Sequence, residues 1–248
     1  MRHLHDLHDL PASHDLPGLA ARLRALPPSC GPVRLVAVDG HAGSGKSTFA
    51  ARLAEAAGGA AAGPGARPGP AAGPGPAGAA QGPGPGPAHG TGSGPGPAPA
   101  PAPVLHLDDL ASHEELFDWT GRLCEEVISP LSAGRSARYH PYDWNLRRFL
   151  EPRTLPAAPL VLVEGVGAGR RALRPRLAAL LWMERGAEES WARGRRRDGP
   201  AQAAFWDGWT PAESRHFAAD PSRPYADLLV CESGAGYTWR GALTGTIG

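Results

Sequence analysis

The 248-residue sequence has only three cysteines, and Cys30, Cys124 and Cys231 lie far apart with no CxxC pair. This spacing argues against a zinc site and against a disulfide framework, and it suits a reducing compartment. The sequence also lacks an apolar run of the ~20 residues that span a bilayer, and its N-terminus lacks the apolar stretch of a signal peptide. These absences predict a soluble, cytoplasmic protein with no membrane partner.

An excess of charge of either sign is also missing. The 25 basic and 24 acidic residues leave a formal charge of +1, and the pI is ≈ 7.9. No long-range field therefore attracts nucleic acid or an acidic membrane surface. The predicted partners are small molecules and not nucleic acid, and the sequence carries no signal for an oligomeric state.

Large side chains are nearly absent from residues 58–103, which consist almost entirely of Gly, Ala and Pro with repeated Gly-Pro pairs. Such a segment has little to bury, so it cannot offset the conformational entropy lost on folding. Glycine does not recur at every third position, which excludes a collagen helix. We predict a disordered insertion, with a proline-rich docking segment as the alternative.

Three His-Asp pairs, at 5–6, 8–9 and 14–15, open the sequence. Both side chains can bind a metal ion, but nothing in a flexible chain end fixes their geometry. We therefore favour a polar leader over a metal site. A short helix over 16–26 follows and ends before Pro27 and Pro28, so that residues 1–30 form one segment.

Apolar strand patterns alternate with helical patterns in the rest of the sequence. Strands are predicted over 33–38, 104–107, 160–163, 179–183 and 226–230. Helices are predicted over 46–57, 114–131, 171–178, 188–197 and 205–217. Strands that are apolar throughout and alternate with helices are typical of a parallel sheet covered on both faces. The predicted fold class is therefore α/β.

Residues 40–47 read Gly-His-Ala-Gly-Ser-Gly-Lys-Ser and match the pattern G-x-x-x-x-G-K-[ST] between a predicted strand and a predicted helix. The glycines let backbone N–H groups turn inward around phosphate oxygens, and the helix dipole adds positive potential. Lys46 is expected to bridge the β- and γ-phosphates of ATP, and the Ser47 hydroxyl to bind Mg²⁺. The predicted nucleotide-binding residues are Gly40, His41, Ala42, Gly43, Ser44, Gly45, Lys46, Ser47 and Thr48.

The motif narrows the fold to a P-loop NTPase three-layer sandwich with a mostly parallel sheet and a disordered Gly/Ala/Pro-rich insertion. We expect one kinase-like domain over 31–57 and 104–230, with a tail over 231–248. A P-loop by itself accounts for nucleotide binding but not for catalysis. Catalysis requires further groups, which in a parallel sheet lie where the strands end.

Two predicted strands end in acids, one at Asp108 and Asp109 and the other at Glu164. Both ends should project towards Lys46, where one carboxylate can accept the proton of an attacking hydroxyl and another can hold Mg²⁺. An acid after a strand can also cap the next helix. Two strands that both end in an acid beside a P-loop favour the catalytic interpretation.

Four arginines, Arg193, Arg195, Arg196 and Arg197, lie in one predicted helix. Arg193 and Arg197 are four residues apart and share a face. Their planar guanidinium groups suit the binding of phosphate oxygens, whereas a solvated basic face is the alternative. The composition of the helix does not favour one interpretation over the other.

These motifs together resemble the uridine kinase-like branch of the P-loop nucleoside kinases, from about Val33 to Val230. The strand ending in Asp108 resembles the strand that carries the family's catalytic aspartate, and residues 163–165 resemble its Glu-Gly strand end. Residues 141–144, Pro-Tyr-Asp-Trp, with Arg147 and Arg148 resemble its Tyr-Asp-aromatic element. Residues 193–198 resemble its lid helix, and residues 225–227 its late Ala-Asp strand. Leu110 and Ala111 depart from the family, which has an aromatic pair at these positions.

The resemblance implies roles for these residues. Asp108 would be the general base and a metal ligand, and Glu164 a second metal ligand. Tyr142, Asp143 and either Arg147 or Arg148 would line the acceptor pocket. Arg193 and Arg197 would close over the phosphates and act with Lys46 in catalysis.

The predicted function is an ATP- and Mg²⁺-dependent transfer of the γ-phosphoryl group to a hydroxyl of a small molecule, with a nucleoside such as uridine as one candidate. A kinase for a nucleotide or another metabolite keeps the mechanism and changes the acceptor. A slow ATP-hydrolysing regulatory protein is the alternative from a different class. A GTP switch is disfavoured because no Asn-Lys-x-Asp element follows the core strands.

Overall fold

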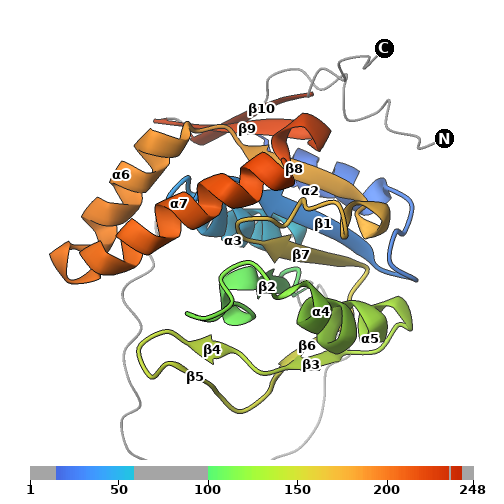
Figure 1. The fold of residues 1–248 in the computed structure, drawn as a ribbon. Helices are drawn as coiled ribbons and strands as arrows, with labels where there is room; N and C mark the ends of the chain where they lie inside the picture. Colours follow the sequence, from blue (N-terminus) through green and yellow to red (C-terminus); the bar gives the residue numbers. More distant parts are fainter. Residues whose placement is uncertain (1–14, 59–99, 235, 242–248) are drawn as a thin grey trace, which may run out of the picture.

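The computed structural model describes residues 15–58, 100–234 and 236–241 of the chain (Figure 1). The first 14 residues, which carry most of the His-Asp pairs, lie outside the described residues. So do residues 59–99 of the predicted disordered insertion and the last seven residues of the predicted tail.

A six-stranded sheet forms the centre of the fold, in the order β10-β9-β8-β1-β7-β2. Five strands are parallel to their neighbours and β10 is antiparallel to β9, which confirms the predicted mostly parallel α/β sheet. The strands are β1 (Arg34–Asp39), β2 (Val104–His106), β7 (Leu160–Glu164), β8 (Ala179–Met183), β9 (Leu228–Ser233) and β10 (Gly236–Gly241). The central position of β1 places the loop that follows it in the middle of one sheet edge.

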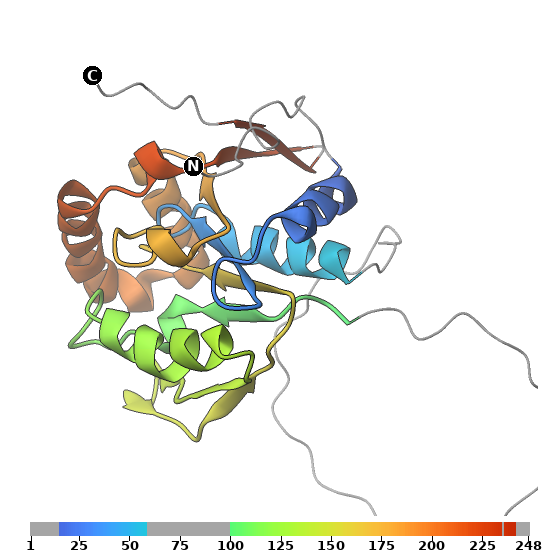
Figure 2. The ribbon, with the colours of Figure 1, turned by 90° about the vertical axis from the view of Figure 1, so that its right-hand side faces the viewer.

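Helices cover both faces of this sheet and complete three layers (Figures 1 and 2). Helices α2 (Leu16–Ala25) and α3 (Lys46–Ala57) lie on one face, where Phe49 and Leu53 of α3 pack against Val36 and Val38 of β1. Their full burial contributes about 1.5–3 kcal/mol for each side chain. The opposite face of β1 carries Leu35 and Ala37, because side chains alternate along a strand.

The second face is covered by a continuous helical segment and by α7. The segment consists of α4 (Thr120–Arg122), the π-helix η2 (Leu123–Ile128) and α5 (Ser129–Ser132). Helices α6 (Ala187–Asp198) and α7 (Ala203–Ala219) follow β8. Two small antiparallel sheets pair β3 (Ala137–Tyr139) with β6 (Arg153–Leu155), and β4 (Tyr142–Asp143) with β5 (Arg148–Phe149). Single 3₁₀ turns are η1 (Leu107–Asp109), η3 (Arg174–Arg176), η4 (Pro200–Gln202) and η5 (Arg223–Tyr225).

Two predicted helices are shorter than expected. The helix predicted over 114–131 begins only at Thr120, because Arg170 takes up polar groups of the preceding turn. Its guanidinium donates to Phe117 O at 2.8 Å and to Thr120 Oγ1, and it covers the Trp119 ring at 3.7 Å. The helix predicted over 171–178 is only the turn η3, in which Arg174 turns back to Gly169 O at 2.7 Å. Tertiary contacts therefore replace the local helical bonds in both segments.

The sheet extends into the segment that the sequence analysis left as a tail. Strand β9 continues to Ser233, and β10 pairs with it along the sheet edge. Tyr237 and Trp239 of β10 are both 2% exposed, because they alternate with residues on the solvent face. The alternation of apolar and polar residues, with a period of two, is the sequence signal that could have predicted this strand.

The two ends of the glycine-rich insertion lie close together. Gly58 ends α3, and Ala102 N donates to Ala54 O at 3.1 Å, while Pro103 O accepts from Leu162 N at 2.9 Å. Residues 100–103 therefore belong to the folded body. Helix α3 starts at the predicted nucleotide loop and carries the chain away from it, so the insertion begins far from that loop.

We predict that replacing residues 59–99 with a linker of about eight residues leaves turnover unchanged and raises the free energy of unfolding by about 1 kcal/mol, because a shorter loop loses less entropy on closure. Steady-state kinetics and denaturant unfolding of both proteins test this prediction. A large fall in turnover would show that the segment contacts the site or a required partner.

Helix α7 packs through His216, whose ring stacks on Phe117 with centroids 4.7 Å apart. Burial and the adjacent Arg170 lower the pKa of His216 to about 4, against the opposing charges of Asp220 and Glu213. The folded protein therefore keeps this imidazole neutral at a pH where the unfolded chain protonates it. Its contribution to stability is complete above the unfolded pKa of 6.5 and is lost as the pH falls towards 4.

We predict that His216→Phe, which preserves the stacking on Phe117, flattens the dependence of stability on pH. Between about pH 7.5 and about pH 5, the free energy of unfolding of the wild type should fall by on the order of 1–2 kcal/mol more than that of the variant. Denaturant unfolding of the wild type and the variant at both pH values measures it. Parallel pH dependence in the two proteins would contradict a neutral, half-buried His216.

Candidate functional site

The loop after β1 has the backbone that its glycines allow. Gly40, Gly43 and Gly45 have φ values of 145°, 85° and 102°, which side-chain-bearing residues rarely adopt. A Cβ atom at Gly43 would lie 2.1 Å from Ser190 O of α6. The loop therefore turns tightly and lies directly beside α6, and α3 begins at Lys46 immediately after it.

Two side chains at the start of α3 turn back towards this loop and the neighbouring strand. The Lys46 ammonium donates to His41 O at 2.9 Å and is 7% exposed. The Ser47 hydroxyl donates to Glu164 Oε1 at 3.0 Å. The parallel register explains this contact, because Glu164 pairs with Val38 near the end of β1.

One cavity of ≈ 310 Å³ brings the predicted phosphate, metal and catalytic residues together. Lys46, Asp108 and Glu164 lie in its wall with both predicted lid arginines. The lining residues are Ala42, Gly43, Gly45, Lys46, Ser47, Thr48, Asp108, Glu164, Gly165, Val166, Arg193, Gly194, Arg197 and Trp209. Of the predicted nucleotide-binding set, Gly40, His41 and Ser44 are absent from this wall.

Asp108 lies in η1, just beyond the end of β2, and this exposed residue lines the cavity. Protein atoms crowd around the carboxyl and raise its pKa to about 6, and the Glu164 charge adds to this effect. Lys46 acts in the opposite direction. A carboxyl with this pKa is largely ionised at neutral pH and can still accept a proton.

Glu164 is 4% exposed and accepts two hydrogen bonds on one oxygen. Ser47 Oγ is one donor, and His106 Nδ1 lies 2.5 Å from the same Oε1 atom. This contact raises the pKa of His106. No sequence signal pointed to His106, because its pairing with Glu164 depends on β2 lying next to β7.

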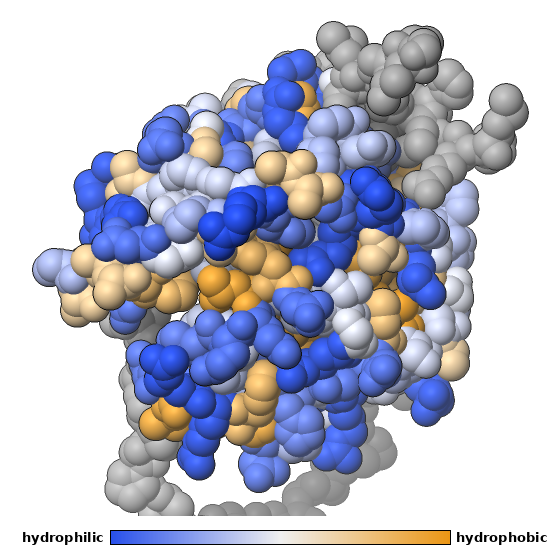
Figure 3. All heavy atoms as spheres, in the orientation of Figure 1, coloured by the Kyte–Doolittle hydropathy of each residue, from blue (hydrophilic) through white to orange (hydrophobic). Residues whose placement is uncertain are grey.

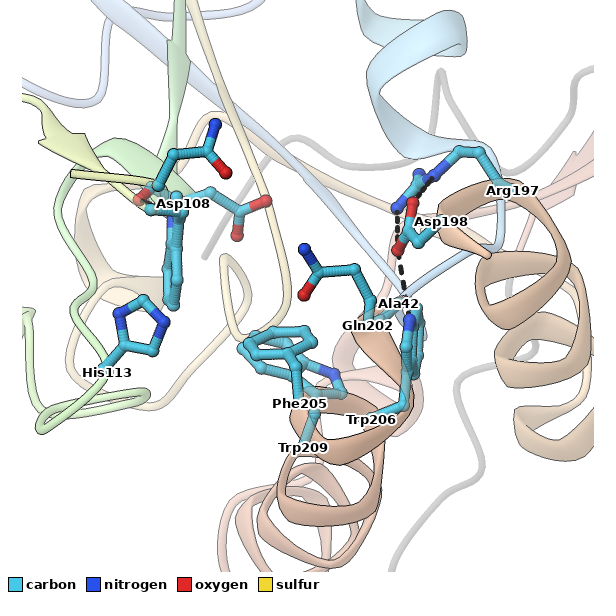
Figure 4. A pocket seen from close by; sticks show the side chains of 11 residues that line it. Ala42, Asp108, His113, Arg197, Asp198, Gln202, Phe205, Trp206 and Trp209 are labelled. Atoms are coloured by element: carbon cyan, nitrogen blue, oxygen red, sulfur yellow. Dashed lines mark hydrogen bonds and ion pairs between the residues drawn. The ribbon is translucent and has the colours of Figure 1, made fainter. Parts of the chain in front are cut away.

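The two predicted lid arginines are partnered by carboxylates. Arg193 donates to Glu232 Oε2 at 2.5 Å, and Arg197 forms two hydrogen bonds with Asp198, at 2.6 and 3.0 Å (Figure 4). Both arginines line the cavity around Lys46, which we name the phosphate cavity after the ligand predicted for it. A phosphate bound there would compete with these carboxylates. Their predicted role over the phosphates stays a prediction.

A second cavity of ≈ 360 Å³ adjoins the first and has an aromatic lining (Figure 4). Asp108 and Arg197 belong to both walls. The lining residues are Ala42, Asp108, His113, Trp144, Asn145, Arg197, Asp198, Gln202, Phe205, Trp206 and Trp209. In the space-filling view, hydrophobic residues gather at the centre of this face, between α7 and the part that carries β4 and β5 (Figure 3).

The four predicted acceptor-binding residues lie behind or beside this cavity and do not line it. The Tyr142 hydroxyl lies 2.9 Å from His113 Nδ1, and Asp143 Oδ1 accepts from Asn145 N at 2.9 Å. Arg147 is exposed and pairs with Glu114 at 3.7 Å, and Arg148 is exposed in β5. The wall uses Trp144 and Asn145 instead, which lie in the turn between β4 and β5.

A buried aspartate, to which the sequence analysis gave no role, fixes the base of the site. Asp39 at the end of β1 is 0% exposed and accepts from Gly40 N at 2.7 Å, Gly167 N at 2.9 Å and Gly169 N at 2.8 Å. Burial raises the pKa of Asp39 and these hydrogen bonds oppose the shift. The carboxylate thus ties the phosphate loop to the loop that follows β7.

In the part of the chain that the structure describes, no group of three or more His, Cys, Asp and Glu residues forms a metal-binding cluster. A Mg²⁺ ion does not require one, since it is commonly held by one or two carboxylates together with substrate phosphates. The same residues contain no helix of the length and apolarity needed to cross a membrane.

No known family model matches the sequence, and no curated protein matches it either. Solved structures do match the fold. A protein described as a possible uridine kinase from Bacillus stearothermophilus superposes with a TM-score of 0.52 at 14% identity, over 86% of this chain and 96% of that one. A candidate fructose transport system kinase from Silicibacter sp. TM1040 gives 0.54 at 20% identity, over 84% and 96%. The chain therefore has the fold of P-loop kinases.

Proposed function

We propose that this protein is a small-molecule kinase that transfers the γ-phosphoryl group of ATP to a hydroxyl group of its acceptor. The position of Asp108 carries the proposal. Its carboxyl belongs to the wall of the phosphate cavity and to the wall of the aromatic cavity. An acceptor hydroxyl and a γ-phosphate held in the two cavities would therefore meet at this side chain.

The donor set at the loop fits Mg²⁺. Ser47 supplies a hydroxyl, and Asp108 and Glu164 supply carboxylates from the ends of two neighbouring strands. Oxygen ligands of this kind suit a hard divalent cation, which leaves its remaining positions for phosphate and water. When bound, the ion would neutralise charge on the β- and γ-phosphates.

The chain's own residues supply the remaining steps. Lys46 leaves His41 O and binds the β- and γ-phosphate oxygens, while Asp108 accepts the proton of the acceptor hydroxyl as that oxygen attacks the γ-phosphorus. The bond from the γ-phosphorus to the bridging oxygen breaks, and ADP leaves with its electron pair. Arg193 and Arg197 exchange their carboxylate partners for phosphate oxygens. Positive charge then accumulates where the transferred group becomes more negative.

The aromatic cavity favours an acceptor without a phosphate group. Of the described residues that line it, Arg197 is the one permanent cation, and in the proposed mechanism it binds the phosphates of ATP. Burial lowers the pKa of His113, which keeps that ring neutral. The rings of Trp144 and Phe205 suit a planar group, while Asn145 and Gln202 can hydrogen-bond its edge. A nucleoside such as uridine fits these features, and a nucleotide fits them less well.

A slow ATP-hydrolysing regulator would need no acceptor cavity beside its catalytic carboxylate. A panel of nucleosides, nucleotides, sugars and vitamins, offered with γ-labelled ATP and Mg²⁺, separates the two functions. We expect label to appear on an uncharged hydroxyl compound. Release of labelled phosphate without any labelled acceptor would contradict the kinase proposal and favour the regulator.

A further inference from the structure

Glu213 of α7 is a fully buried carboxylate to which neither the sequence motifs nor the proposed chemistry gives a role. Its exposed fraction is 0%, although α7 lies on the side of the site opposite the catalytic acids. Burying an ionised carboxylate is costly unless hydrogen bonds and nearby positive charge offset the loss of water. The contacts that provide this compensation indicate what the residue does.

Two of those contacts hold the phosphate loop. Glu213 Oε1 lies 2.7 Å from His41 Nδ1, and Oε2 accepts from Ala42 N at 3.2 Å. The His41 ring is further enclosed by Phe217, with centroids 5.1 Å apart. The His41 side chain therefore points away from the phosphates and anchors the loop to α7. Its backbone oxygen is also the acceptor for the Lys46 ammonium.

The third contact leads to the acceptor side. Trp209 Nε1 donates to Glu213 Oε2 at 2.6 Å, and the Trp209 ring stacks on Phe205 with centroids 5.5 Å apart. Trp209 lines both cavities, and Phe205 lines the aromatic one (Figure 4). A short series of contacts thus runs from the phosphate loop through the Glu213 carboxylate to Trp209 and Phe205, which form the aromatic wall of the second cavity.

Only a carboxylate satisfies this arrangement. The donors from Ala42, Trp209 and His41 converge on two oxygens that both accept. These hydrogen bonds and the charge on Lys46 keep the pKa of Glu213 low in spite of its burial. A glutamine has the same shape but only one accepting oxygen, so its amide N–H groups would face a donor in place of an acceptor.

We propose that Glu213 is a positioning residue that joins the phosphate loop to the aromatic wall, so that nucleotide bound at the loop orders the wall that receives the acceptor. The inference rests on the proposed kinase function, because it takes the two cavities as nucleotide and acceptor sites. By linkage, an acceptor on the wall tightens nucleotide binding by the same factor.

Hydrogen–deuterium exchange with MgADP as the probe tests the link without a known acceptor. In the wild type, MgADP should slow exchange in the loop over 40–48 and also in α7. Glu213→Gln should weaken MgADP binding roughly tenfold, because a buried donor loses its partner. The remaining bound state should show protection in the loop but not in α7.

Two further variants complete the design. Ser214→Ala, which removes only an exposed hydroxyl bonded to Thr210 O in the same helix, should behave as the wild type in every measurement. Trp209→Phe keeps the loop contacts of Glu213 and breaks its link to the wall, so loop protection should remain while protection of the part of α7 over 205–209 disappears. This variant tests the link even if Glu213→Gln does not fold.

The outcomes separate the two proposals. Binding of MgADP without protection of α7 in the wild type would contradict the link alone, as would α7 protection that persists in both Glu213→Gln and Trp209→Phe. Absence of any MgADP binding to the wild type would contradict the kinase function and the link together.

Discussion

Asp108→Asn should leave ATP binding nearly intact and lower phosphoryl transfer about 100-fold or more, which is the range for loss of an acid–base group. The amide has the shape of the carboxyl but cannot take up the acceptor proton. Asp108 lines both cavities, so the substitution acts where the two substrates meet. Calorimetry with MgATP and rapid-quench transfer to the acceptor found in the labelling panel measure the two effects separately.

Asp109→Asn is the matched control, since it changes the neighbouring carboxyl of the same turn. Asp109 accepts from the Tyr139 hydroxyl at 3.0 Å and lines neither cavity. Its substitution should leave transfer within a few-fold of the wild type. Equal losses of binding and transfer in Asp108→Asn, or equal effects of the two variants, would contradict the assignment of Asp108 as the base.

Lys46→Ala should weaken MgATP binding about 10- to 100-fold, since a charge-assisted contact with phosphate is removed. Turnover should fall further, because the same ammonium stabilises charge on the transferred group in the transition state. The variant therefore differs in kind from Asp108→Asn, in which binding survives. Calorimetric titration with MgATP and steady-state kinetics measure the two losses.

The comparison for Lys46 is Arg52→Ala, which removes one positive charge from the exposed face of the same helix. Arg52 lies over the Tyr237 ring at 5.5 Å and lines neither cavity. Its loss should change MgATP affinity little. Unchanged affinity in Lys46→Ala would show that the triphosphate lies elsewhere.

The segment 33–57 was readable from the sequence because its signals are local. The strand pattern, the glycines and the helix pattern predict β1, the loop and α3, and α3 has the predicted bounds Lys46–Ala57. The placement of the acids also followed from a general property of parallel sheets. Asp108 and Glu164 line one cavity with Lys46 because β2, β7 and β1 are adjacent.

The residues that hold the site in shape were not readable, since their partners are distant in sequence. Asp39 is held by glycines 128 and 130 positions later, and Glu213 by a loop residue 172 positions before it. A single carboxylate in a helical pattern indicates a surface position, and only the tertiary arrangement shows that it is buried. The same reasoning applies to His106, which needs the strand order to meet Glu164.

The aromatic cavity shows a finer limit of sequence-based prediction. The motif at 141–144 drew attention to Tyr142 and Asp143, but Trp144 and Asn145 face the cavity. Trp144 and Asn145 lie in the turn between β4 and β5, where the alternation of a strand no longer determines which way a side chain points. The contribution of α7 through Phe205, Trp206 and Trp209 could not be placed at all, because a helix rich in Trp is equally typical of a packed core.

A crystal structure with Mg²⁺ and a non-hydrolysable ATP analogue would show where the triphosphate and the metal ion bind. We predict that the triphosphate lies in the loop over 40–47, with Lys46 on its terminal phosphates, and that the metal ion contacts Ser47. We also expect the γ-phosphate to face Asp108 across the boundary between the two cavities. A γ-phosphate turned away from Asp108, or a triphosphate bound outside the loop, would contradict the proposed function.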